Sequence, residues 1–184
     1  MKRILTIAFA LTLVATSAFA QDRSYGWSIS ASSTDPAQNV GQLPIGAPGS
    51  VYLHLDCTTV DGMSAMEADI VATGLLYLSF TPLNGVLNAG AGTALLLAVG
   101  GCPADDFLAG AIGVLDFGSG GDVCLVASAA NGTNGTVDCD AVSPQLSDNA
   151  VTGFSTNGTQ CSDGVCRIVS VEPQSWGGVK SLYK

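Results

Sequence analysis

Turn-forming dipeptides recur at short intervals along this chain and limit what it can fold into. Asn-Gly or Asp-Gly begins at positions 61, 84, 131, 134, 157 and 163. Both dipeptides tolerate the positive φ angles that tight β-hairpins require. Between them lie short apolar or alternating segments, at 25–31, 50–56, 66–72, 75–80, 94–99, 111–117, 123–128, 136–140 and 165–171. The spacing predicts an all-β domain of about nine strands rather than a parallel α/β sheet, which would need long helical runs between the strands.

The two-residue period of a β-strand assigns the side chains of these segments to opposite faces. Glu67 and Asp69 are predicted to face water, and His54 to be an exposed or half-buried strand residue. Segment 94–99 does not alternate, which predicts a central strand covered on both faces. The residues predicted to face the core are Val51, Leu53 and Leu55 in segment 50–56 and Met66, Ala68, Ile70 and Ala72 in segment 66–72.

The first twenty residues have the pattern of a secretory signal peptide. Lys2 and Arg3 precede the apolar stretch 4–14, and Ala18-Phe19-Ala20 places small residues where a signal peptidase cleaves. We therefore expect residues 1–20 to be removed and residues 21–172 to form one exported β-domain, followed by a tail at 173–184. No later apolar run is long enough to span a bilayer, so we expect a secreted or cell-surface protein without a membrane span.

The charge of the chain excludes one class of function. It has 15 acidic and 6 basic residues, and its isoelectric point is near 4.1. After residue 20 only four basic residues remain, so the expected mature chain has a formal charge of 4 − 15 = −11. A chain with this charge repels phosphate, which argues against a nucleic-acid partner.

Six cysteines follow the predicted signal peptide. An even number outside the cytosol predicts three disulfides, whereas a zinc site is disfavoured because the chain has no Cys-x-x-Cys and only one His. Fifteen pairings are open. Our hypothesis, from turn and strand positions, pairs Cys161 with Cys166, Cys124 with Cys139, and Cys57 with Cys102.

The last twelve residues differ from the rest. Ser175 can cap a short helix, and Lys180 lies toward its carboxyl end, where a cation suits the helix dipole. One interpretation is a helix that caps the β-domain; the other is a docking or sorting peptide. The anchors of such a peptide would be Trp176, Val179, Lys180, Leu182 and Tyr183.

Several segments together resemble a known group of proteins. They are segment 51–57, the acidic strand 65–70 that runs into Gly74, Gly-Gly-Cys at 100–102, strand 110–117, segment 137–140, and the tail at 171–184. The chain is similar to secreted bacterial proteins that have one cohesin-like or immunoglobulin-like β-sandwich and end in a Ser-Trp-Gly-x-Ile/Val-Lys-x-Leu-Tyr type of tail. The resemblance implies a single antiparallel β-sandwich, cohesin-like, immunoglobulin-like or a jelly roll, and an exported location. The resemblance implies no catalytic residues.

Catalytic patterns are weak. His54, Asp105 or Asp106, and Ser119 stand in the chain order of a chymotrypsin-like triad, but Ser119 lacks the Gly-Asp-Ser-Gly-Gly context. The segment around Ser119 is better interpreted as a glycine-rich hairpin, and we expect no enzyme. Neighbouring carboxylates could bind calcium in a loop, although none has EF-hand spacing. These carboxylates are Asp105 with Asp106, Asp116 with Asp122, and Asp138 with Asp140.

The first functional hypothesis is a non-catalytic binding or structural module with a protein or glycan partner outside the cytoplasm. The alternative is a carbohydrate-binding module, with calcium as its cofactor if one is present. The aromatic residues open to that role are Tyr25, Trp27, Tyr52, Phe80 and Phe154. Trp27 alternates with Ile29 and is better interpreted as a core residue. The pattern leaves the partner and the oligomeric state open.

Overall fold

A computed structural model describes residues 25–58, 62–104, 106–140 and 146–162. The predicted signal peptide, Asp105, Cys166 and the predicted C-terminal helix with its docking residues lie outside these ranges. The regular elements of the described residues are all strands. These residues contain no helix long and apolar enough to cross a membrane. The strands are β1 (Tyr25–Ser30), β2 (Pro48–Cys57), β3 (Met63–Thr73), β4 (Leu75–Pro82), β5 (Leu87–Asn88), β6 (Ala94–Ala98), β7 (Phe107–Asp116), β8 (Asp122–Val126), β9 (Gly135–Asp138), β10 (Leu146–Thr152) and β11 (Phe154–Ser155).

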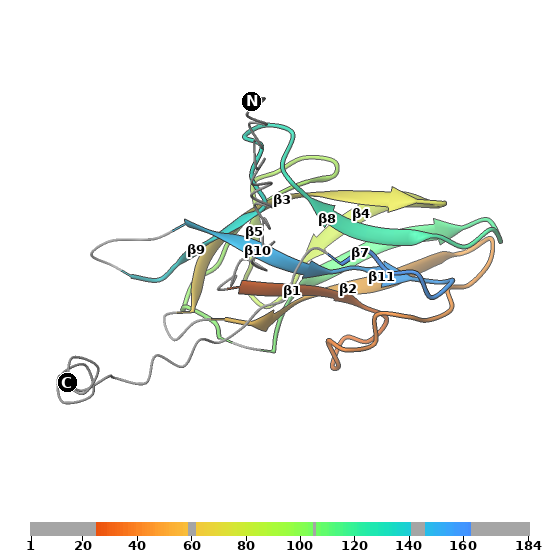
Figure 1. The fold of residues 1–184 in the computed structure, drawn as a ribbon, viewed down its shortest axis with the longest axis horizontal. Coiled ribbons are helices and arrows are strands. Elements are labelled where there is room, and N and C mark those ends of the chain that lie inside the picture. The colour runs from red at the N-terminus through yellow and green to blue at the C-terminus, as the bar shows by residue number, and fades with distance from the viewer. Residues whose placement is uncertain (1–24, 59–61, 105, 141–145, 163–184) are drawn as a thin grey trace, which may run out of the picture.

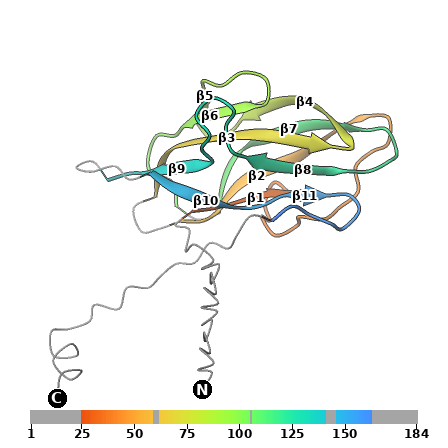
Figure 2. The ribbon, with the colours of Figure 1, turned by 45° about the horizontal axis from the view of Figure 1, so that its top comes forward.

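These strands form one continuous sheet (Figures 1 and 2). Its order is β11-β8-β3-β9-β10-β1-β2-β7-β4, while β6 pairs with β3 and β5 pairs with β6. The all-β prediction is confirmed, but the sheet is mixed and nearly closed rather than a clear, purely antiparallel sandwich. Strand β10 pairs with β9 on one side and, in parallel, with β1 on the other, which joins the two halves into a nearly closed mixed sheet.

Eight of the nine predicted segments contain a strand, and the ninth, 165–171, lies outside the described residues. β3 pairs with β6 along one edge, and with both β9 and β8 along the other. Residues 127–134 leave the sheet between β8 and β9, and Gly153 interrupts the line from β10 to β11. Strands β5, β10 and β11 were not predicted.

The core lies inside the curled sheet and follows the predicted alternation. Val51, Leu53 and Leu55 are fully buried, and the predicted inner residues of β3 are buried too, except that Ala72 is half-buried. The side chains on both faces of β1 are buried along its whole length. The core prediction for these two segments is therefore confirmed.

Two predictions about burial are wrong. His54 is only 2% exposed, and its Nε2 lies 2.8 Å from the carbonyl oxygen of Ser32. The segment that follows β1 folds back over this part of the sheet and is tied to it through the Asn39 side chain, which donates to the carbonyl of Ile29. Strand β6 alternates: Leu95 and Leu97 are buried while Leu96 is exposed, because only the inner face of this strand is covered.

The gap in the nearly closed sheet lies between β4 and the turn that joins β5 to β6. The Tyr77 hydroxyl donates a 2.7 Å hydrogen bond to the carbonyl of Gly92 across it, and burial raises the pKa of this hydroxyl. A polar pocket of about 250 Å³ remains beside this bond, lined by Phe80, Asn88 and neighbouring residues. The side-chain bond thus joins the two parts where no backbone ladder does.

The turn between β3 and β4 provides a test of the packing. Gly74 has φ +75°, and a Cβ there would overlap the carbonyl oxygen of Gly120. Gly85 has φ +78° in the Asn-Gly turn after β4, but a Cβ there would meet nothing within 4 Å. Both Gly→Ala variants carry the left-handed backbone cost, about 1–2 kcal/mol. We expect Gly74→Ala to lose about 1–3 kcal/mol more than Gly85→Ala in urea unfolding, since only it adds the overlap. Equal losses would mean that the turn does not lie against Gly120.

Candidate functional site

The cysteines pair differently from the hypothesis. Cys102 bonds to Cys139 and Cys124 bonds to Cys161, with Cα–Cα distances of 5.9 and 6.2 Å. Cys57 is also disulfide-bonded. The three hypothesised pairs are therefore wrong. Val71 of β3 lies opposite Cys124, and Met63 lies opposite Asp138, the residue before Cys139. Eight residues of β3 separate these points, about 26 Å of strand, which is too far for a bond.

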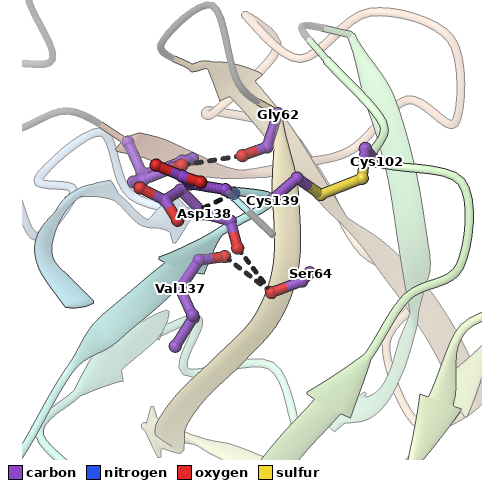
Figure 3. Close-up of a disulfide and its surroundings, with 8 residues drawn as sticks. Gly62, Ser64, Cys102, Val137, Asp138 and Cys139 are labelled. Atoms are coloured by element: carbon purple, nitrogen blue, oxygen red, sulfur yellow. Dashed lines mark hydrogen bonds between the residues drawn. A yellow bond between two sulfur atoms is a disulfide. The ribbon is translucent and has the colours of Figure 1, made fainter. Parts of the chain in front are cut away.

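The Cys102–Cys139 bridge closes one end of the sheet (Figure 3). Beside it, the Ser64 hydroxyl lies 2.7 Å from the carbonyl oxygen of Asp138 and 3.3 Å from that of Val137. The Tyr25 hydroxyl donates a 2.7 Å bond to the carbonyl of Gly62 nearby. The bridge and these bonds hold β1, β3 and β9 together at the place where β3 begins.

The triad candidates do not come together. His54 lies opposite Leu108 near the start of β7, whereas Ser119 follows the end of that strand. Eight residues of β7 separate Leu108 from Asp116, about 26 Å. The Ser119 hydroxyl points instead to the carbonyl of Gly74, at 3.5 Å. Ser119 thus belongs to the glycine-rich turn between β7 and β8.

Two of the carboxylates proposed for calcium, Asp116 and Asp138, serve local turns. Asp116 is buried, and its Oδ1 accepts hydrogen bonds from the backbone N–H of Gly118, at 2.7 Å, and of Gly120, at 3.1 Å. Asp138 Oδ1 accepts from the N–H of Asp140 at 3.1 Å. Within the part of the chain that the structure describes, no three His, Cys, Asp or Glu side chains gather closely enough to hold a metal ion.

The aromatic candidates do not form an exposed platform. Tyr25, Trp27 and Phe154 are buried, as predicted for Trp27, and Tyr52 and Phe80 are half-buried. Among the described residues, the exposed aromatic side chain is one that sequence reasoning missed: Phe117 is 69% exposed, directly after the last residue of β7. Its place between a strand and a Gly-Ser-Gly-Gly turn was the signal that could have identified it.

One outer face of the sheet carries a band of exposed apolar side chains. We call it the β3 face. Register places Ala65, Ala98 and Val137 on one row across it, with Leu87 and Leu146 at the two ends of that row. Leu96 lies opposite Glu67 in the next row. The exposed apolar residues of the β3 face are Val71, Leu87, Leu96, Val126 and Leu146.

Carboxylates lie between these apolar side chains. Glu67 and Asp69 point outward from β3, and Asp148 lies on β10 across Gly135 from Glu67. Glu67 accepts bonds of 2.8 and 3.0 Å from the side-chain amide of Asn131, and Asp69 accepts a 2.9 Å bond from the N–H of Ala129. The two β3 carboxylates thereby hold the 127–134 excursion against the middle strand of the face.

An apolar pocket continues the β3 face at the far end of β3. It has a volume of about 380 Å³ and is lined by Val71, Val126, Val151 and the Cys124–Cys161 bridge. Ser162, the last residue that the structure describes, also lines it. The face is therefore an apolar and acidic surface with one shallow hollow, suited to contact with another chain.

Comparison with family models and with curated proteins finds no match. Two solved structures resemble the fold. The sixth cohesin of Acetivibrio cellulolyticus scaffoldin B, in complex with a mutant Cel5 dockerin, is 16% identical, with a TM-score of 0.50 over 72% of this chain and 97% of that one. A cohesin module of a Clostridium perfringens family 33 glycoside hydrolase is 10% identical, with a TM-score of 0.50 over 78% of this chain and 98% of that one. At these identities the likeness shows the fold alone, and that fold is cohesin-like.

Proposed function

We propose that the chain is an exported, non-catalytic module that binds a protein partner through the β3 face. The observation that carries the proposal is the apolar row from Leu87 to Leu146, in which both end residues are exposed, with exposed Leu96 in the next row. Within that row Ala98 is exposed, and Ala65 and Val137 are half-buried. Contiguous apolar patches of this kind mark interaction sites on soluble domains. The cohesin from Acetivibrio cellulolyticus was solved with a dockerin bound, which supports a protein rather than a small molecule as the partner.

The chemistry of the face indicates what kind of protein fits it. Glu67, Asp69 and Asp148 lie among the apolar side chains of the band, and no Lys or Arg occurs between Arg23 and Arg167. An acidic surface attracts a basic partner and speeds its approach, while the apolar band provides the buried contact. The partner we expect therefore carries apolar side chains flanked by Lys or Arg.

The proposed location outside the cytoplasm agrees with the chemistry of the chain. Disulfides persist in oxidising compartments and are rare in the cytosol. The two described bridges, together with the signal-peptide pattern at 1–20, support export to the cell surface or beyond. In this proposal the tail at 173–184 is a docking or sorting peptide.

A matched pair of substitutions tests the proposed face. Leu96 on the β3 face is 48% exposed, and Leu76 on β4, outside that face, is 49% exposed. We expect Leu96→Asp to reduce capture of envelope and culture-supernatant proteins of the producing organism at least about tenfold, since one buried apolar contact is lost and a charge is buried. Leu76→Asp should leave capture unchanged.

Thermal unfolding should show both variants folded, and the captured proteins are identified by mass spectrometry. Polysaccharide pull-down with the same variants tests the carbohydrate alternative. Equal capture by the two variants, or capture of polysaccharide in place of protein, would contradict the proposed function.

A further inference from the structure

Acidic and basic residues are segregated along this chain. Between Arg23 and Arg167 every charged side chain is acidic, and three of the four basic residues that follow position 20 come after Ser162. Glu67, Asp69 and Asp148 thus stand on the β3 face of a module whose described residues hold no Lys or Arg to offset them. The cations that could do so within the mature chain are Arg23, before the described residues, and Arg167, Lys180 and Lys184, after them.

The segment 173–184 has the composition that the β3 face is suited to bind. It carries Lys180 and Lys184 and no acidic residue. Its large apolar side chains are Trp176, Val179, Leu182 and Tyr183. The segment therefore combines apolar anchors with positive charge, whereas the face combines an apolar band with negative charge.

The segment can also reach the face of its own module. The chain leaves the described structure at Ser162, on the wall of the apolar pocket that continues the face. By elimination Cys166 is the partner of Cys57, which ends β2, two strands from β10 across β1. The free tether from Cys166 to Trp176 is then 176 − 166 = 10 residues. Fully extended they span about 33 Å, and as a flexible coil about 17 Å on average. The five strands β5, β6, β3, β9 and β10 are together about 19 Å wide between the outer two.

We propose that segment 173–184 docks on the β3 face of its own chain and acts as an internal competitor of the partner. The inference rests on the proposed function, because it assigns the regulation of the same face. A tether whose average length matches the distance to its site gives an effective concentration in the millimolar range, about 1 mM or more. The segment of a second copy would compete with the tethered segment only if the protein concentration approached this effective concentration. Docking within one chain therefore prevails at lower protein concentrations.

The accessibility of Lys180 to trypsin tests this on the intact mature chain. Docking shields Lys180, so we expect release of residues 181–184 to be about tenfold faster in Leu96→Asp than in the wild type, because cleavage follows the undocked fraction. Leu76→Asp, with the same exposure outside the β3 face, should be cleaved at the wild-type rate. Equal rates in all three proteins would overturn the proposal.

A labelled synthetic peptide of residues 173–184 gives a second, independent measurement. The variant Trp176→Ala with Lys180→Glu should release the tail, so it should bind the peptide at least about tenfold more tightly than the wild type does. Adding Leu96→Asp to that variant should abolish binding. Equal affinity for wild type and variant, or no binding to the variant, would overturn the proposal. So would a wild type that forms dimers at micromolar concentration while the variant is monomeric, since the occupant would then be a second copy.

The two proposals fail separately. If Leu96→Asp loses the partner while Lys180 is cleaved equally in every protein, the proposed function stands and the internal competitor is wrong. If Lys180 is shielded in the wild type and exposed in Leu96→Asp, but no protein is captured in a manner that depends on the face, the tail docks and the proposed function is wrong.

Discussion

Replacing Trp27 with Ala is expected to lower the free energy of unfolding by about 3–5 kcal/mol, the loss typical of a large buried aromatic side chain. Trp27 is 1% exposed and lies between Leu55 of β2 and Val151 of β10, both of which are buried. Its position is at the parallel junction that joins the two halves of the sheet. A cavity there removes contacts from both halves at once, and urea unfolding followed by far-UV circular dichroism measures the loss.

The Trp27 side chain also begins a buried chain of hydrogen bonds. Its indole N–H donates to the Thr136 hydroxyl at 2.9 Å, that hydroxyl donates to Asn149 Oδ1 at 2.6 Å, and Asn149 Nδ2 donates to Asn134 Oδ1 at 2.9 Å. The bonds connect β1 to β9, β10 and the end of the 127–134 excursion. A buried network of this kind fixes the arrangement of the strands as well as filling space.

Trp27→Phe separates the two contributions. It keeps most of the apolar volume and removes the indole donor, so we expect a loss of about 1–3 kcal/mol, less than for Trp27→Ala. Thr136→Val should behave similarly, since it breaks the same network one step further along. A Trp27→Ala variant that loses less than about 1 kcal/mol would contradict the central place given to this side chain.

The core faces of β2 and β3 could be predicted from the sequence because their two faces differ in polarity. Val51, Leu53 and Leu55 alternate with polar or aromatic residues, and Glu67 and Asp69 alternate with the apolar residues of β3. Register in such a strand is fixed, since a shift of one residue would bury the carboxylates. Local pattern and tertiary burial therefore agree there.

The same reasoning failed for β6, and the failure concerns Leu96, a side chain of the proposed docking surface. Its sequence, Ala-Leu-Leu-Leu-Ala, is apolar on both faces, and periodicity cannot separate a strand buried on both sides from one with an apolar outer face. The structure leaves Leu96 exposed on the β3 face. Docking surfaces contain apolar residues that the fold leaves exposed. The uniformly apolar sequence of β6 therefore gave no sign of the proposed docking surface.

Contacts between distant segments could not be predicted at all. Whether β10 lies beside β1 depends on how the whole sheet closes, and no property of either strand encodes it. The cysteine pairs failed for the same reason: the hypothesis joined Cys124 to Cys139 across an apparent hairpin, but β8 and β9 follow one another along a single edge of β3. His54 was misjudged because its cover comes from the loop that contains Ser32.

Removing either described disulfide by a pair of Cys→Ser substitutions is expected to lower the free energy of unfolding by about 4 kcal/mol through the entropy of the unfolded chain. The prediction is the same for Cys102–Cys139 and Cys124–Cys161, because each joins residues 37 positions apart. Urea unfolding of the two double variants measures this. Non-reducing peptide mapping should first recover these two linked pairs, and by elimination a third peptide pair that contains Cys57 and Cys166. A peptide linking Cys124 to Cys139 would contradict the topology of the sheet.

The two bridges should nevertheless differ in their effect on binding. Cys124 and Cys161 line the apolar pocket that continues the β3 face, and Gly153 beside them has no room for a Cβ because it would overlap the Cys161 sulfur. Cys102 and Cys139 instead close the end of the sheet beside Ser64, away from that pocket. Where both double variants remain folded, we therefore expect Cys124→Ser with Cys161→Ser to weaken partner capture more than Cys102→Ser with Cys139→Ser does. Equal binding by two variants of equal stability would mean that the pocket takes no part in the contact, and would confine the docking surface to the rows that contain Leu87, Leu96 and Leu146.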